Sequence, residues 1–153
     1  MYDPSSRAVT NDDLQAVRAL IERYAWAVDD DDVEGVVACF APDARFVSAD
    51  MALEGHEALR SFFASALGDG AAGTTSSHLM ANISVVVRSP DRCDVRTAAV
   101  VYHADRDSGR IAVRGITYTD VCGRTTEGWR FEQREHRLRW AGELPGGTAA
   151  PLT

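Results

Sequence analysis

The spacing of apolar residues changes once along the chain, and this change limits what the chain can fold into. Up to about residue 67, apolar side chains recur every three or four positions, as on one face of an amphipathic helix. From about residue 76 onward, segments rich in Val, Ile, Thr and aromatic residues alternate with the period of a β-strand. Helices followed by a run of strands predict an α+β fold, with the helices packed on one face of a sheet.

Three helices are expected in the first part of the chain. Thr10 and Asp13 form a capping box, which opens the first helix. The acidic run from Asp29 to Asp32 separates the first two helices, because carboxylates favour a helix N-terminus. The expected helices cover residues 10–29, 33–40 and 56–67; Pro42-Asp43 ends the second, and a flexible connection from Gly68 to Gly73 follows the third.

The second part of the chain predicts an antiparallel meander. Its long segments are separated by turn residues such as Ser89-Pro90-Asp91. The expected strands cover 45–48, 79–88, 93–104, 111–124 and 129–140. In the first long strand, one face would carry Leu79, Ala81, Ile83, Val85 and Val87, and the other His78, Met80, Asn82, Ser84 and Val86. Both faces are too apolar for water, so one is expected to cover the helices and the other a partner, which predicts a homodimer.

Size and composition indicate one globular domain. Of the 153 residues, 45% are hydrophobic and 25% are charged, which differs from a disordered chain. We expect a flexible arm over 1–9, a domain over 10–142 and a loose tail over 143–153. No apolar run approaches the roughly 20 residues that span a bilayer, and residues 1–7 do not resemble a signal peptide. A cytoplasmic protein with reduced thiols is therefore expected, the thiols being Cys39, Cys93 and Cys122.

Charge and motifs exclude several classes of function. The formal net charge is −7, so the chain offers no basic stripe for nucleic acid. All sixteen basic residues are arginine, which excludes a lysine Schiff base and a phosphate-loop lysine. No metal-binding spacing of His or Cys and no nucleotide-binding glycine motif occurs. Catalysis without cofactor or metal is therefore expected.

Several segments together resemble the SnoaL-like polyketide cyclase family, which belongs to the nuclear-transport-factor-2-like superfamily with scytalone dehydratase and ketosteroid isomerase. The resemblance covers about residues 10–140. It is carried, in order, by the segments Tyr24-Ala-Trp-Ala-Val-Asp29, Phe40-Ala-Pro-Asp-Ala, Glu54-Gly55, Ser77-His78-x3-Asn82 and Gly128-Trp129-Arg130-Phe131. It implies a cone-shaped curved antiparallel sheet, an α+β barrel, packed by N-terminal helices around one pocket. The fold alone does not fix the chemistry, because it hosts enzymes and binding proteins.

The resemblance also implies catalytic residues. In the dehydratase-like branch, an aspartate that ends the first helix pairs with a histidine at the start of the first long strand, and Asp29 and His78 match these positions. Histidine is suited to proton transfer near neutral pH, and a carboxylate on its other nitrogen fixes the tautomer. Tyr24 matches a pocket tyrosine whose hydroxyl would donate to a developing enolate oxygen. The alternatives are that Asp29 caps a helix or faces solvent, that His78 is incidental, and that Tyr24 belongs only to the core.

Further pocket residues are expected on the other strands. Either Tyr102 or His103 faces inward, because neighbours on a strand alternate. Arg134 and His136 share one face of the last strand. The expected substrate-binding residues are Phe40, Phe46, Phe62, Met80, Asn82, Tyr102, Tyr118, Asp120 and His136. His56 is expected to start a helix rather than to bind a ligand.

These observations favour a cofactor-independent acid–base enzyme, a dehydratase, cyclase or isomerase, that acts on a small apolar molecule of aromatic or polyketide type. The first alternative is a non-catalytic domain on the same fold that binds a small ligand. A second alternative is the small subunit of a ring-hydroxylating oxygenase, which shares the fold.

Overall fold

The computed structural model describes residues 9–67 and 73–144. The structure does not describe residues 1–8 of the expected arm (1–9), 68–72 of the expected connection (68–73) or 145–153 of the expected tail (143–153), and residues 143 and 144 belong to the last strand. Within the described part, the order of elements is three helices with two short strands, followed by four long strands. The predicted α+β class is confirmed. No helix in the described ranges is long and apolar enough to cross a membrane.

The first helix begins where the capping box predicts. α1 covers Asn11–Asp29, and the hydroxyl oxygen of Thr10 accepts a hydrogen bond from the Asp13 amide while Asp13 accepts one from the Thr10 amide. α2 covers only Val33–Val37, capped by Asp32, and α3 covers Gly55–Leu67. The apolar face of α1 is buried at Val17, Leu20, Ile21, Tyr24 and Val28.

The chain after α2 differs from the prediction. β1 covers Phe40–Ser48, so Phe40 begins a strand instead of ending a helix, and Pro42 lies within the strand. The strand tolerates this proline because its pairing with β6 is irregular between Phe40 and Arg45. A second strand, β2 at Met51–Glu54, forms a hairpin with β1 that the sequence did not predict.

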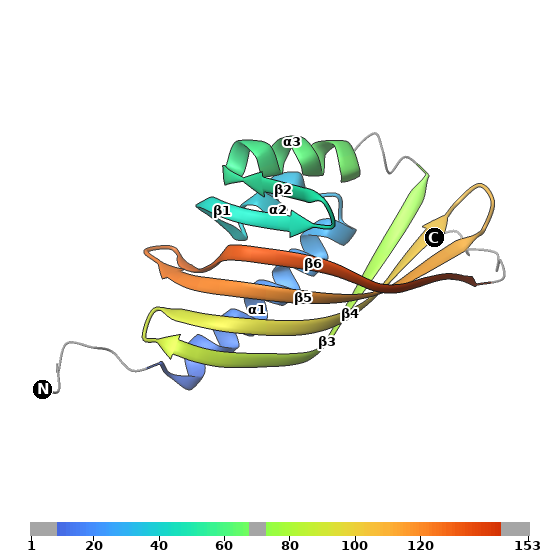
Figure 1. Cartoon of the computed structure of the whole chain (residues 1–153). Helices are drawn as coiled ribbons and strands as arrows, with labels where there is room; N and C mark the ends of the chain where they lie inside the picture. Colours follow the sequence, from blue (N-terminus) through green and yellow to red (C-terminus); the bar gives the residue numbers. More distant parts are fainter. Residues whose placement is uncertain (1–8, 68–72, 145–153) are drawn as a thin grey trace, which may run out of the picture.

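The four long strands are β3 (Thr74–Ser89), β4 (Arg92–Asp105), β5 (Ile111–Thr125) and β6 (Gly128–Leu144). The sheet has the order β2-β1-β6-β5-β4-β3. Strands β3 to β6 form the predicted antiparallel meander, whereas β1 is parallel to β6, so the sheet is mixed. It is not closed into a barrel, because β2 and β3 remain at its edges. In Figure 1, α1 runs across the face of the long strands and α3 lies beside β1 and β2.

β3 contains a bulge that corrects the predicted faces. Its pairing with β4 shifts between Ala81 and Ser84, and Asn82 has a φ of 50°. The bulge moves every later residue to the opposite face, so the predicted alternation is wrong beyond Ala81. The face toward α1, called the inner face from here on, carries His78, Met80, Ile83 and Val85, which are part-buried, whereas Leu79 and Ala81 are exposed on the outer face.

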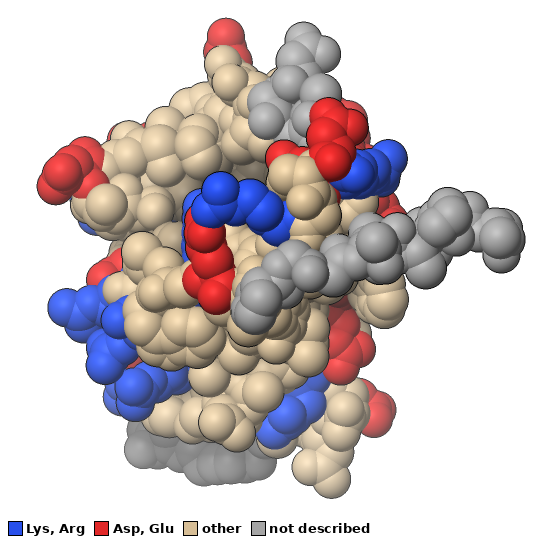
Figure 2. Space-filling view, turned by 90° about the vertical axis from the view of Figure 1, so that its right-hand side faces the viewer, with Lys and Arg blue, Asp and Glu red and all other residues tan. Residues whose placement is uncertain are grey.

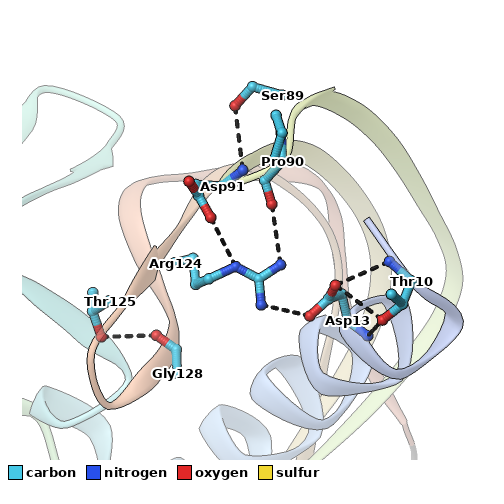
Figure 3. Close-up of polar contacts among 8 residues, drawn as sticks. All are labelled: Thr10, Asp13, Ser89, Pro90, Asp91, Arg124, Thr125 and Gly128. Carbon is cyan, nitrogen blue, oxygen red and sulfur yellow. Dashed lines mark hydrogen bonds and ion pairs between the residues drawn. The ribbon is translucent and has the colours of Figure 1, made fainter. Parts of the chain in front are cut away.

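A polar cluster joins the start of α1 to the turn between β3 and β4 and to the end of β5 (Figure 3). Arg124, near the end of β5, donates one hydrogen bond to Asp13 over 2.6 Å and one to Asp91 over 2.9 Å. A third goes to the carbonyl of Pro90 over 3.0 Å, and the guanidinium stacks on Trp129. The hydrogen bond from Arg124 lowers the pKa of Asp13 well below its usual range. The cluster therefore fixes where α1 begins relative to two sheet turns.

Asp13→Asn is expected to destabilise the protein at neutral pH and much less in acid. The pKa of Asp13 is lower in the folded state, so its contribution is present above the unfolded pKa of about 4 and is lost as pH falls through the folded value. The difference between wild type and variant in the free energy of unfolding, measured with urea, should stay constant from about pH 7 to about pH 5 and shrink progressively as the pH falls below about 4. Asp12→Asn, at the exposed neighbouring position, is the control and should show a smaller difference. A gap for Asp13→Asn that does not change with pH would contradict this account.

Candidate active site

Asp29 and His78 meet at the junction of α1 and β3. The Nδ1 atom of His78 lies 2.6 Å from Oδ1 of Asp29, and the His78 amide donates to Oδ2 over 2.7 Å. The hydroxyl of Ser76, two residues earlier on the same face of β3, donates to Oδ1 over 2.8 Å. Because a carboxylate only accepts, Nδ1 of His78 carries a proton, so in the neutral form of the ring Nε2 is the proton acceptor.

This pair is largely removed from water. The side chains of His78 and Asp29 are only 8% and 14% exposed. Asp29 is the last residue of α1, where the helix dipole disfavours a negative charge, and the three donors offset that cost. Asp29 does not cap α2, since Asp32 does so. The helix-cap alternative for Asp29 is therefore excluded by the geometry.

A small cleft of about 140 Å³ lies beside the pair, between α1 and β3. Trp26, on the solvent side of α1, is 68% exposed beside it. The cleft is lined by Glu22, Ala25, Trp26, Asp29, His78 and Met80. The pair can thus be reached from the surface between α1 and the edge strand β3.

Two further histidines lie on the inner face. His103 of β4 is opposite Ser76, and its ring centre is 6.4 Å from that of His78. Tyr102 is opposite Ser77 and therefore lies on the outer face, so of the two candidates His103 faces inward. His136 of β6 is opposite Tyr118, and its Nδ1 is 3.0 Å from the hydroxyl of Ser48.

These histidines are biased toward their neutral forms. Burial lowers the pKa of His103, and the nearby Arg114 guanidinium lowers it further. Burial likewise lowers the pKa of His136, with Arg134 and Arg114 adding to the effect. We call His78, His103, Arg114 and His136 the histidine patch; all four lie on the inner face, as the strand register shows.

A buried ion pair lies in the core, on the same face of the sheet as the histidine patch. Arg134 donates to both oxygens of Asp120 over 2.8 and 2.9 Å, and both side chains are fully buried. The guanidinium lies 4.1 Å from the ring centre of Tyr24 and 4.3 Å from that of Tyr118. Burial raises the pKa of Asp120, an effect that Arg134 opposes. Burial raises the pKa of Tyr24 to about 12 and also raises the pKa of Tyr118, so both phenols stay protonated at neutral pH.

The expected substrate-binding residues are therefore not all in one place. Phe40, Phe46, Tyr118 and Asp120 are buried in the core, where aromatic rings from α1, α3, β1 and β6 pack edge to face. Phe62 is part-buried on α3, Met80 lies beside the Asp29–His78 pair, and His136 lies in the histidine patch. Asn82 is exposed on the β3 bulge, and Tyr102 is on the outer face.

Sequence reasoning did not place Ser76, Trp26 or Arg114 near the Asp29–His78 pair. Ser76 could have been found, because residues two apart on a strand share a face with His78. Arg114 had no distinguishing local signal among sixteen arginines. Two larger clefts, each of about 430 Å³, lie elsewhere: one between α2, the start of α3 and the β5–β6 turn, and one beside His136 at the end of β1. Among residues 9–67 and 73–144, no group of three or more His, Cys, Asp or Glu side chains is placed to hold a metal ion.

The fold and the site define an α+β protein with a curved sheet, N-terminal helices and a largely buried His–Asp pair. The family model of the SnoaL-like domain matches residues 10–135. The chain therefore belongs to the SnoaL-like domain family. No curated protein matches the sequence.

Solved structures share the fold at low sequence identity. A proposed scytalone dehydratase from Novosphingobium aromaticivorans DSM 12444 is 18% identical, with a TM-score of 0.77 over 92% of this chain and 94% of that one. Hexachlorocyclohexane dehydrochlorinase LinA-type3 from Novosphingobium barchaimii LL02 is 16% identical, with a TM-score of 0.75 over 94% and 100%. A protein of unknown function with a cystatin-like fold from Nostoc punctiforme PCC 73102 is 19% identical, with a TM-score of 0.71 over 87% and 96%. These structures establish the fold class.

Asp120→Asn is expected to lower the free energy of unfolding by roughly 3–5 kcal/mol, because it leaves the Arg134 guanidinium buried without its counter-charge. Urea unfolding at neutral pH measures the loss. The double variant Asp120→Leu with Arg134→Met removes both charges and should lose less stability than the single variant. Equal or greater loss in the double variant would show that shape, rather than charge balance, determines stability at this position.

Proposed function

We propose that the protein is a cofactor-independent acid–base enzyme, a dehydratase, cyclase or isomerase, that uses His78 and Asp29 on a small apolar substrate of aromatic or polyketide type. The observation that carries the proposal is the 2.6 Å contact between Nδ1 of His78 and a largely buried Asp29 carboxylate. This contact leaves Nε2 of His78 as a proton acceptor. The similar structures described as a proposed scytalone dehydratase and a dehydrochlorinase support elimination chemistry on this fold.

In this mechanism His78 moves the proton. Nε2 of His78 takes a proton from carbon beside a carbonyl or a leaving group, and Asp29 stabilises the imidazolium that forms. In a dehydration, the same imidazolium returns the proton to the departing hydroxyl, so the ring ends neutral. The hydrogen bonds from Ser76 and the His78 amide hold Asp29 in place during this cycle.

Tyr24 is the proposed donor to the developing oxygen charge. Its pKa of about 12 keeps the hydroxyl protonated at neutral pH, and the Arg134 guanidinium lies against its ring. Tyr24 lies on α1, five residues before Asp29, which places both residues on the same helix. A phenol that stays protonated can donate to an enolate oxygen as charge develops there.

His78→Asn is expected to lower kcat by about 10²–10⁴-fold on a substrate found by screening small aromatic ketones and hydroxyketones, because the acid–base group is lost. Asp29→Asn should also lower kcat, since the amide cannot stabilise the imidazolium as the carboxylate does. His56→Asn is the matched control: His56 lies in a separate cleft, bonded to the Phe40 carbonyl, and its substitution should leave kcat unchanged.

Two outcomes would contradict the catalytic assignment. If His78→Asn turned over the substrate as fast as wild type, the acid–base role would belong to another group. If ligands bound tightly to the wild type with no conversion over long incubation, the non-catalytic binding domain would be the better interpretation.

The proposal includes a cytoplasmic location. The three buried cysteines form no disulfide, which is consistent with that location.

A homodimer formed through the outer sheet face is part of the same proposal. Leu79 and Trp140 are 54% and 52% exposed on that face, and Val86 is 49% exposed. The strand register places all three opposite the helices. Leu79 and Trp140 lie in one row across the strands, through Val100 and Gly115, and exposed apolar side chains grouped in this way are typical of a protein–protein contact.

Replacing Leu79 by Glu is therefore expected to convert a dimer into a monomer, because it introduces a charge among the exposed apolar side chains of the outer face. Sedimentation velocity on both proteins measures the oligomeric state. Glu135→Gln, a part-buried change on β6 that introduces no new charge, serves as the control. A monomeric wild type would refute the homodimer without affecting the catalytic assignment.

A further inference from the structure

Arg114 stands in direct line with the His78–Asp29 pair across the sheet. His78 on β3 is opposite Val101 on β4, Val101 is opposite Arg114 on β5, and Arg114 is opposite Ala141 on β6. Directly opposed residues in an antiparallel sheet share a face, so Arg114 lies on the inner face with His78. Adjacent strands are about 4.8 Å apart, which places Arg114 roughly two such spacings from the histidine.

The other charged groups near Arg114 already have partners. Asp29 accepts three hydrogen bonds from β3, Asp120 is held by Arg134, and Glu143 pairs with Arg110. Within residues 9–67 and 73–144, no carboxylate forms an ion pair or hydrogen bond with Arg114. Arg114 is exposed, so its guanidinium keeps its donors available to a ligand.

The inner face beside Arg114 carries apolar side chains, and the Arg110–Glu143 ion pair lies next to it along the strands. The nearest neighbours of Arg114 on the inner face are apolar: Val101, Ala112, Ile116 and Ala141. Burial lowers the pKa of both His103 and His136, which favours their neutral forms. Figure 2 shows basic and acidic side chains interspersed at the end of the molecule that holds the β4–β5 turn. No broad positive field draws anions there, so recognition of an anion depends on Arg114 itself.

We propose that Arg114 binds an anionic oxygen group of the substrate, a carboxylate, and thereby makes this site selective for acids over their neutral analogues. The inference rests on the proposed acid–base function of the His78 site and names its substrate class. The guanidinium holds the two carboxylate oxygens by paired hydrogen bonds, which fix the orientation of the molecule on the inner face. The part of the substrate toward β3 then lies against Nε2 of His78.

This arrangement separates binding from chemistry. The carboxylate keeps its charge throughout, so Arg114 contributes equally to the ground state and to the transition state, and its loss should raise KM more than it lowers kcat. His78 performs the proton transfer and should affect kcat instead. Arg114 is thus a specificity-determining residue rather than an acid or base.

The test uses the full-length protein and three matched pairs of probes: benzoate, trans-cinnamate and 1-naphthoate, each beside its primary amide. The dissociation constants are measured by NMR titration, with ring signals of histidine-labelled protein used to place the ligand at His78. We expect wild type to bind at least one acid about tenfold more tightly than its amide, as hydrogen bonds to a charged group require. Arg114→Met should abolish this preference, and Arg114→Lys should retain part of it.

Arg23→Met is the control, because Arg23 is exposed on α1 and its substitution changes the net charge equally. It should keep the preference for acids. The proposal is overturned if no acid binds more tightly than its amide to wild type, or if Arg114→Met keeps the preference. His78→Asn should keep the binding preference while losing turnover, so failure of the catalytic assignment and failure of the Arg114 assignment give different results. Circular dichroism and thermal unfolding confirm that each variant is folded.

Discussion

The geometry of the site depends on the buried ion pair between Arg134 and Asp120. The pair lies on the two central strands β5 and β6, and the Arg134 guanidinium contacts the ring of Tyr24 on α1. Two charges taken out of water need close partners, so the pair has little freedom to move. Because Tyr24 packs on this guanidinium, the pair fixes how far α1 extends over the sheet. The end of α1 then delivers Asp29 to His78, so the buried pair determines the position of the carboxylate in the site.

The position of Asp29 at the end of α1 carries an electrostatic cost, which hydrogen bonds from β3 offset. A carboxylate at the last residue of a helix faces the negative end of the helix dipole. Ser76, the His78 amide and the His78 ring all donate to it from one short stretch of β3. The same donors orient the imidazole and fix its tautomer. The same hydrogen bonds therefore stabilise the α1–β3 junction and set the orientation of the His78 ring.

Local signals predicted most of the fold, and non-local contacts account for what was missed. The capping box at Thr10 and the four long strands were predicted because each is encoded by adjacent residues. The sequence did not predict that Phe40 begins a strand or that β1 is parallel to β6, because these depend on pairing with residues far along the chain. The pairing of His78 with Asp29 was predicted from a family resemblance. The position of Arg114 on the same face of the sheet follows only from the register of three strands.

The bulge at Asn82 divides β3 into two halves, and the alternation of side chains between the two faces shifts by one residue between them. Before it, the strand presents His78 and Met80 to α1, and beyond it the strand presents Ile83 and Val85. Without the extra residue, strict alternation would place His78 and Met80 on one face of the strand and Ile83 and Val85 on the opposite face. The left-handed backbone at Asn82 thus lets one strand hold the Asp29–His78 pair at one end and pack against the core at the other.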